Sequence, residues 1–215
     1  MRLFVSPFAP NAMRVQIVAR EKSIDLDMID VSANRADFLA LNPLGQVPVL
    51  ERADGSILTE SLTICHYLDS VSGPFLFGDT AEDRLTIAMW ERRSEMQLFN
   101  PGVEYGHHVH PMFAGSMTQF PDYAATLRPK ANRAAAVFAE RLDEHRYLAG
   151  ATFSAADITA CLGYLFLRGY GAFEAEAWPS IERWSDAILA RDSMTQVRQM
   201  VAWFEASRAG TGNPD

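Results

Sequence analysis

Hydrophobic and polar positions follow two different periods along the first part of the chain. Arg2–Val5 is a short apolar run ended by Ser6-Pro7, and residues 26–31 alternate with a period of two, so each segment predicts a short β-strand. Between them, residues 11–22 carry apolar side chains at the spacing of a helix that buries one face. A shorter helix is predicted around residues 38–41, where Asn42-Pro43 ends it.

A hairpin and a third helix complete this part of the pattern. Residues 47–51 and 56–59 have strand character and flank Ala53-Asp54-Gly55, where glycine supplies the positive φ of a tight turn. Residues 62–68 return to helical spacing. The predicted order is β-α-β-α-β-β-α, which indicates an α/β domain with one mixed sheet covered by helices.

The chain changes character near residue 75, because no strand pattern follows. We predict an α/β domain over residues 1–75, a linker over 76–80, an all-helical domain over 81–207 and a frayed tail over 208–215. The expected helices cover residues 81–113, 122–145, 155–170, 179–191 and 194–206.

Composition and charge exclude several classes of protein. The 215 residues are 48% hydrophobic and 21% charged, as in an ordinary globular protein. Residues 1–80 hold 6 basic and 10 acidic groups and residues 81–215 hold 13 and 17, so each part contributes −4 to the net charge of −8. Without a basic stripe, neither nucleic acid nor an anionic membrane is an expected partner.

Targeting signals and cysteines point to the cytoplasm. The N-terminus lacks the basic and apolar segments of a signal peptide, and no apolar run approaches the ~20 residues that cross a bilayer. The two cysteines, Cys65 and Cys161, are far apart and lie within helical patterns. We interpret them as buried hydrophobes of a protein from a reducing compartment.

The segment Asn42-Pro43-Leu44-Gly45-Gln46-Val47-Pro48-Val49-Leu50 is the first candidate site. Pro48 opens a strand, where its missing N–H does no harm to a sheet ladder. A cis bond before it would leave the amide and carbonyl of Val47 to pair with an extended peptide. The alternative is a trans proline that only starts the strand.

The pair Glu60-Ser61 precedes the third helix. Ser61 is placed as an N-cap, and the helix start offers amides to a carboxylate. Glu60 can bind an ammonium group, so the pair suits the head group of an amino acid. The alternative is a plain cap beside a solvated glutamate.

These motifs resemble the soluble glutathione transferases. NPLGQVPVL followed by a hairpin and TESLTICHYL is similar to the glutathione-binding half of that family, which has a thioredoxin-like fold. Residues 150–158 are similar to its helix-capping segment, in which Ser154 and Asp157 form a capping box. The likeness covers roughly residues 2–205 and implies a thioredoxin-like α/β domain followed by an all-α domain.

The resemblance implies a role for each motif. Val47, before a cis Pro48, would bind the cysteinyl backbone of glutathione, and Gln46, Glu60 and Ser61 would hold its carboxylates and γ-glutamyl end. Ser154 and Asp157 are structural, because they cap a helix. Glutathione is the expected co-substrate, and no metal is expected.

The catalytic position departs from the family pattern. Relatives stabilise the glutathione thiolate with a serine or cysteine at the start of the first helix, whereas this chain has Ala9-Pro10 there. Asn11 and Ser6 are the remaining donors, and we favour Asn11. The alternative for Asn11 is an ordinary N-cap. The absence of cysteine at residue 9 argues against disulfide exchange by a protein thiol.

The second substrate is less well indicated. Phe8, Tyr105, His108 and Met112 are candidates for an apolar electrophile pocket. His107, His108 and His110 lack the carboxylates or thiols that would complete a metal site, so we expect solvated, interface or pocket histidines.

The sequence therefore predicts a cytoplasmic glutathione transferase for a small hydrophobic electrophile, as in detoxification. Peroxide or disulfide reduction through bound glutathione is an expected side activity. The alternatives are a non-enzymatic glutathione-binding or interaction protein of this fold, and a specialised glutathione-dependent lyase or isomerase. The family pattern implies a homodimer, with the helix around residues 90–99 as a candidate face.

Overall fold

The computed structural model of the protein describes residues 1–7, 9–71, 73, 75–173 and 178–208. The chain forms two compact units, Met1–Phe77 and Gly78–Asp215. The first is a small α/β unit and the second is helical, which is the fold class that the pattern predicts. Each unit is described by itself.

A four-stranded mixed sheet forms the centre of the first unit. Its strands are β1 (Arg2–Val5), β2 (Asp27–Asp30), β3 (Val49–Glu51) and β4 (Ile57–Leu58), in the order β2-β1-β3-β4. β1 pairs in parallel with β2 and antiparallel with β3, and β3 forms the predicted hairpin with β4. Gly55, in the hairpin turn, has a φ of 80°.

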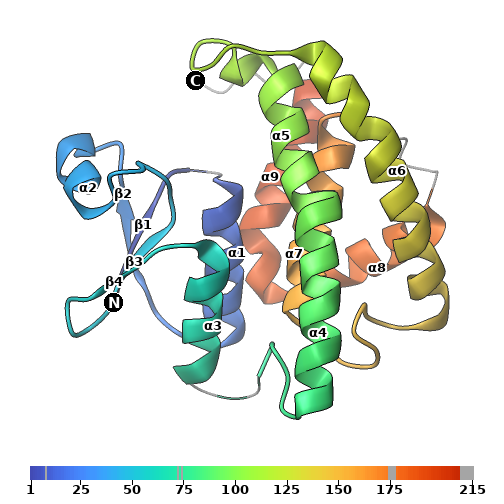
Figure 1. The fold of residues 1–215 in the computed structure, drawn as a ribbon, viewed down its shortest axis with the longest axis horizontal. Coiled ribbons are helices and arrows are strands. Elements are labelled where there is room, and N and C mark those ends of the chain that lie inside the picture. Colours follow the sequence, from blue (N-terminus) through green and yellow to red (C-terminus); the bar gives the residue numbers. More distant parts are fainter. Residues whose placement is uncertain (8, 72, 74, 174–177, 209–215) are drawn as a thin grey trace. The chain divides into compact units, whose positions relative to one another are not determined.

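Helices cover both faces of this sheet. α1 (Pro10–Glu21) and α3 (Ser61–Val71) pack against each other on one face, and α2 (Arg35–Leu41) lies on the other (Figure 1). Phe38 of α2 is buried in a core with Phe4 and Val49. This arrangement brings the starts of α1 and α3 to neighbouring positions.

The helical unit is built around one buried helix. All residues of α7 from Ala155 to Leu167 are buried, and α4, α5, α8 and α9 pack against it. The elements are α4 (Ala81–Ser94), η1 (Glu95–Phe99), α5 (Asn100–Val109), η2 (Pro111–Phe113), α6 (Pro121–Glu144), α7 (Ala155–Gly169), α8 (Pro179–Leu189), η4 (Asp192–Met194) and α9 (Thr195–Arg208).

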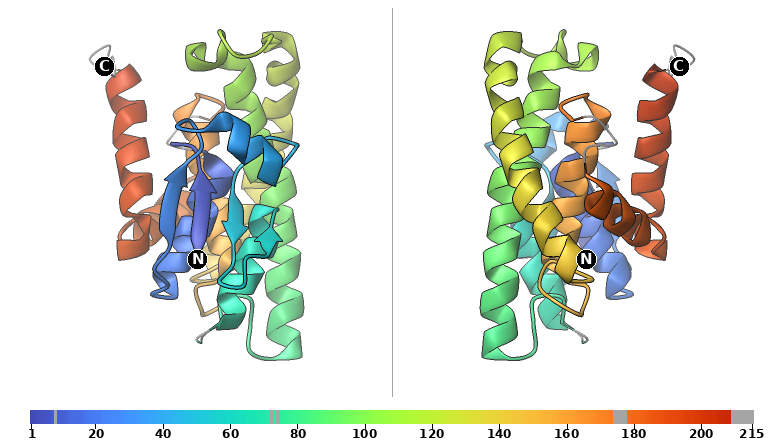
Figure 2. Two further views of the ribbon diagram at one scale, coloured as in Figure 1. Left: turned by 90° about the vertical axis from the view of Figure 1, so that its left-hand side faces the viewer. Right: turned by 90° about the vertical axis from the view of Figure 1, so that its right-hand side faces the viewer.

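A π-helical turn joins α4 and α5 into one continuous rod (Figure 2). In this turn, η1, the Asn100 amide donates to the Glu95 carbonyl, five residues back. Pro101 accounts for the wider turn, because its ring crowds the carbonyl four residues before it and it has no N–H to donate. A side chain on Gly163 of α7 would place its Cβ 2.4 Å from the Phe99 nitrogen, so the turn requires glycine there.

No helix in the described ranges is long and apolar enough to cross a membrane. The predicted tail, apart from Arg208, falls outside the described residues.

Candidate functional site

Three polar side chains meet where α1 and α3 begin. Asn11 Oδ1 accepts a hydrogen bond from Ser61 Oγ at 2.8 Å and another from Arg14 Nη2 at 3.1 Å. Arg14 Nη2 also donates to Ser61 Oγ at 2.6 Å. These bonds close a ring that we call the Asn11–Arg14–Ser61 network. It joins the sequence candidates Asn11 and Ser61, which are 50 residues apart in the chain.

Asn11 lies inside α1, one residue beyond its first position. The helix begins at Pro10, and Ala9 occupies the N-cap position without a side-chain hydrogen bond. The alternative interpretation of Asn11 as an ordinary N-cap is therefore wrong. Ser6, the second donor candidate, follows β1, and its carbonyl accepts the Ala9 amide at 3.2 Å.

Arg14 is a member of the site that sequence reasoning missed. Only 3% of this residue is exposed, although guanidinium groups are costly to bury without partners. The available signal was an arginine three residues after Asn11 on the face of α1 that also buries Met13 and Ile17. A charge on an apolar helix face indicates a specific partner.

The loop before β3 is organised by a buried asparagine. Asn42 Nδ2 donates to the Gln46 carbonyl at 2.8 Å, and its Oδ1 accepts the Leu44 amide at 3.3 Å. The Val47–Pro48 peptide bond is cis, as the resemblance implies. Gln46 is exposed, while Val47 packs against the core on the α2 face of the sheet.

Glu60 and Ser61 adopt different roles from those expected of a simple cap. The Glu60 carbonyl accepts the Ile64 amide at 3.0 Å, so Glu60 precedes α3 and Ser61 is its first residue. The prediction of Ser61 as N-cap is wrong by one residue, because its hydroxyl contacts Asn11 and Arg14 instead. Glu60 is exposed with a φ of 62°, a left-handed conformation that is unusual for a residue other than glycine.

A second cation lies beside the loop before β3. The guanidinium of Arg35 donates to the Gly45 carbonyl at 3.4 Å and lies 5.8 Å from the centre of the Phe38 ring. Arg35 is exposed, and sequence reasoning gave it no role. It places a positive charge next to Gln46 in a unit whose net charge is negative.

The four predicted residues of the electrophile pocket differ in burial and in the residues that they contact. Tyr105 is buried and Met112 is exposed, while Phe8 falls outside the described residues. The His108 ring contacts Tyr123, with 5.3 Å between ring centres, and its Nδ1 accepts the Phe120 amide at 3.3 Å.

A different set of aromatic side chains comes together in the helical unit. The His110 ring lies 5.4 Å from Tyr170 and 5.3 Å from Trp203, and Phe204 contacts both Tyr170 and Trp203. We call these four residues the aromatic cluster. Burial lowers the pKa of His110, which favours its neutral ring. The cluster joins α5, α7 and α9, so sequence spacing gave no sign of it.

The histidines of the helical unit and the two cysteines differ in their surroundings. Burial and the neighbouring His108 lower the pKa of His107. Within the described ranges, no three His, Cys, Asp or Glu side chains gather as possible metal ligands. Both cysteines are buried, and burial raises the pKa of Cys161 to about 12, well away from that of a reactive thiolate.

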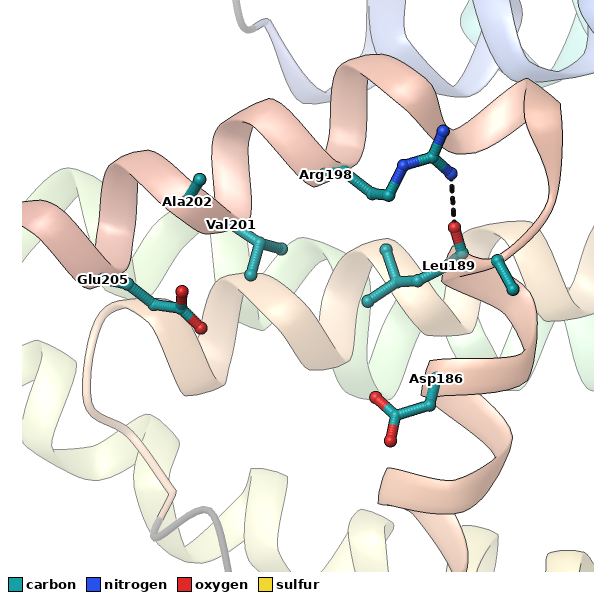
Figure 3. A pocket seen from close by; sticks show the side chains of 7 residues that line it. Asp186, Leu189, Arg198, Val201, Ala202 and Glu205 are labelled. Atoms are coloured by element: carbon teal, nitrogen blue, oxygen red, sulfur yellow. Dashed lines mark hydrogen bonds between the residues drawn. The ribbon is translucent and has the colours of Figure 1, made fainter.

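A cavity of about 260 Å³ lies between α8 and α9, and its lining contains none of the predicted site residues. Asp186 and Glu205 extend beside it, while Arg198 is engaged by the Leu189 and Arg191 carbonyls at the turn between the helices (Figure 3).

Family models match both units of the chain. The model of the glutathione S-transferase N-terminal domain matches residues 8–71, and that of the C-terminal domain matches residues 106–192. The chain belongs to the glutathione S-transferase family. Its relatives include glutathione S-transferase 2 of Saccharomyces cerevisiae, 30% identical over 93% of this chain and 90% of the relative. Glutathione S-transferase 3 of Zea mays is also 30% identical, over 89% and 90%.

Solved structures show the same glutathione S-transferase fold. A glutathione S-transferase domain-containing protein of Marinobacter aquaeolei has a TM-score of 0.81 and 32% identity, covering 91% of this chain and 100% of that one. Gtt2 from Saccharomyces cerevisiae has a TM-score of 0.80 and 29% identity, covering 92% and 100%.

Proposed function

We propose that the protein is a glutathione transferase in which Asn11 stabilises the thiolate of bound glutathione. The observation that carries this proposal is the Asn11–Arg14–Ser61 network. Arg14 and Ser61 both hydrogen-bond to Asn11 Oδ1, so the carboxamide nitrogen is directed away from them. A side-chain N–H donor at the first turn of α1 is what a chain with Ala9 in the usual catalytic slot needs.

The chemistry requires a lowered thiol pKa. A free thiol titrates near ~8.5, so little thiolate is present at neutral pH. A hydrogen bond from Asn11 Nδ2 and the partial positive charge of the α1 N-terminus both favour the thiolate. The thiolate then attacks an electrophilic carbon, a carbon–sulfur bond forms, and the leaving group departs.

We place glutathione along the first unit by matching its groups to those of the chain. The backbone of Val47, before the cis Pro48, pairs with the cysteinyl residue as an added strand would. The amides at the start of α3 receive the γ-glutamyl carboxylate, and Glu60 receives its ammonium. Gln46 and Arg35 are the partners of the glycyl carboxylate, because Arg35 is the cation beside that loop.

The second substrate is a small hydrophobic electrophile, the substrate class that the family resemblance implies. The same bound thiolate can reduce a hydroperoxide or a disulfide, which we propose as side activities. The low cysteine content supports a cytoplasmic location as part of this proposal.

One observation favours a second function. Ala9 removes the side-chain donor that relatives use, so the protein can instead be a glutathione-binding or interaction protein without turnover. The two functions differ in one measurable quantity. An enzyme lowers the pKa of the bound thiol, whereas a binding protein has no need to do so.

Site-directed variants test the catalytic assignment. We expect Asn11→Ala to lower the rate of conjugation with an aryl chloride at neutral pH by about tenfold to a hundredfold, as loss of one thiolate donor predicts. Ser6→Ala tests the second donor candidate and should stay within about twofold of the unchanged protein if Asn11 is the donor. Assays with hydroperoxides and disulfides use the same variants.

Two outcomes would contradict the proposal. Full activity in Asn11→Ala would remove Asn11 from the mechanism. Glutathione binding without turnover on any electrophile would favour the second function.

A further inference from the structure

We propose that Arg14 is a positioning residue, whose guanidinium fixes the orientation of the Asn11 carboxamide and so determines which atom of Asn11 faces the substrate sulfur. This inference rests on the proposed function, in which Asn11 stabilises the thiolate. Arg14 itself is not assigned a contact with glutathione.

The orientation follows from the chemistry of the groups. A guanidinium has five N–H donors and no acceptor, so only the oxygen of a carboxamide can face it. Arg14 Nη2 lies 3.1 Å from Asn11 Oδ1, which identifies the oxygen by its partner. The Nδ2 group is therefore turned the other way. Rotation of the carboxamide by half a turn would bring two N–H groups against a buried cation.

Ser61 reinforces the same orientation. Its Oγ accepts from Arg14 at 2.6 Å and donates to Asn11 Oδ1 at 2.8 Å. The hydroxyl proton is thus engaged inside the network, because Arg14 can only donate. The side chain of Ser61 is consequently a second anchor for Asn11, and its backbone amide at the start of α3 is the group that can serve a ligand carboxylate.

Burial holds the Asn11–Arg14–Ser61 network in place and strengthens its electrostatic interactions. Arg14 is 3% exposed and Ser61 is 5% exposed, so bulk water does not compete for these bonds. The Arg14 guanidinium that donates to Asn11 Oδ1 also polarises the carboxamide, which makes the Nδ2 hydrogens better donors. An asparagine held in this way can replace a hydroxyl group, whereas an unsupported asparagine would rotate freely.

The test measures the pKa of the glutathione thiol bound to the full-length protein, from the ultraviolet absorbance of the thiolate against pH. The variants are Arg14→Met, Arg14→Lys, Ser61→Ala, Asn11→Ala and the double variant Asn11→Ala with Arg14→Met. Affinity for S-methylglutathione, which has no thiol, reports binding separately. Thermal unfolding reports the fold.

We expect Arg14→Met to raise the thiol pKa toward the value of free glutathione and to lower the conjugation rate about tenfold at neutral pH. The double variant should match Asn11→Ala, because Arg14 acts through Asn11. One nitrogen of Arg14, Nη2, makes both contacts, and the lysine of Arg14→Lys keeps the charge but ends one bond short of that position. It should therefore resemble Arg14→Met more than the unchanged protein. S-methylglutathione should bind each Arg14 variant within about threefold of the unchanged protein.

Two results would overturn the inference while leaving the proposed function intact. In one, Asn11→Ala raises the thiol pKa but Arg14→Lys and Ser61→Ala do not. In the other, the effects of Asn11→Ala and Arg14→Met add, which would mean that the Arg14 charge acts on the sulfur directly. If Asn11→Ala leaves the thiol pKa unchanged, the role of Asn11 in the proposed function is itself refuted, whatever the Arg14 variants show.

If Arg14→Met does not fold, the variant Asn11→Asp can be used instead, because it retains the hydrogen bonds to Arg14 and Ser61. Asn11→Asp presents two carboxylate oxygens to Arg14 and Ser61 but has no N–H to offer the sulfur. We expect it to fold and to raise the thiol pKa at least as far as Asn11→Ala. Ser61→Ala, with one of two anchors removed, should produce a smaller rise in the same direction. An unchanged thiol pKa in both Ser61→Ala and Arg14→Lys would refute the role of Arg14.

Discussion

Two residues other than glycine have a positive φ in the described part of the chain, and they serve different purposes. Ser23, with a φ of 53°, follows α1, where Ile24 N donates to the Ala19 carbonyl at 2.8 Å and closes the helix end. Glu60, with a φ of 62°, precedes α3 in the candidate glutathione site. Glycine adopts this conformation without strain. Replacing either residue by glycine should therefore relieve backbone strain.

We therefore expect Ser23→Gly and Glu60→Gly to have similar effects on stability, but only Glu60→Gly to affect ligand binding. Each should leave the free energy of unfolding unchanged or raise it by up to about 1 kcal/mol, because left-handed strain is relieved. Glu60→Gly should also weaken glutathione binding about tenfold, through loss of a charge-assisted bond to the ammonium. Urea unfolding and calorimetric titration with glutathione measure the two quantities.

The comparison between the variants decides the role of Glu60. Ser23→Gly is the matched control and should bind glutathione like the unchanged protein. Equal affinity in Glu60→Gly would show that the glutamate side chain has no part in binding and that its backbone conformation is only a feature of the turn.

Single residues also mark the limit of what the sequence can predict. The pair Glu60-Ser61 and the segment before Pro48 could be found because their chemistry is local. The role of Arg14 could not, since it depends on Ser61, which is 47 residues away and reaches it only through the packing of α1 on α3. The offset of Asn11 from the N-cap has a local cause, because Pro10 already occupies the first position of the helix.

Among the helices, two capping boxes share a design but differ in burial. Asp157, the third residue of α7, accepts four hydrogen bonds at 3.0 Å, from Leu148 N, Ser154 N, Ser154 Oγ and Trp184 Nε1. Asp83, the third residue of α4, forms a capping box with Thr80 at an exposed helix end. The first box thus ties α7 to the chain before it and to α8, while the second caps only its own helix.

We expect Asp157→Ala to lower the free energy of unfolding by about 3 kcal/mol, because several buried donors lose their acceptor at once. That exceeds the ~1 kcal/mol of a simple cap. Asp83→Ala removes the same motif from a solvated end and should cost clearly less. Urea denaturation of both variants checks the difference. Equal losses would mean that the bonds to Leu148 and Trp184 contribute nothing beyond capping.

The interruption of the long helix shows where periodicity stops being informative. Hydrophobic spacing predicts continuous helix over residues 81–113, and the structure adds the π turn of η1 within it. One extra residue in a single turn changes the hydrophobic periodicity too little to be detected in an apolar stretch of sequence. Pro101 was the available signal, and Gly163 on the facing helix is visible as a partner only once the chain is folded.

For the molecule as a whole, the sequence indicates where the chain divides more directly than it indicates which residues would face a second copy. The boundary after Phe77 lies close to the predicted linker, because composition changes there. The predicted interface around residues 90–99 includes Trp90 and Phe99, and both are buried inside their own unit. Periodicity indicates that a helix has an apolar face, but it cannot assign that face to the core or to a partner.

The exposed side of the rod that α4 and η1 form, which includes Met96 of the predicted stretch, is our candidate for the dimer contact. Leu85 is 68% exposed, Met89 44% and Met96 45%, and their spacing of four and seven residues places them on one side of the rod. Exposed apolar side chains that line up along a helix are typical of a surface covered by another chain. We propose that a second copy of this chain covers it.

We expect the protein to sediment as a dimer at micromolar concentration, and the double variant Leu85→Glu with Met89→Glu to sediment as a monomer. Two carboxylates at the centre of an apolar contact would be desolvated without partners, which raises the dissociation constant at least about a hundredfold. Val137→Glu is the matched control, because Val137 is 50% exposed on α6 and outside this face. It should remain dimeric. A double variant that stays dimeric, or an unchanged protein that sediments as a monomer, would show that α4 does not form the contact.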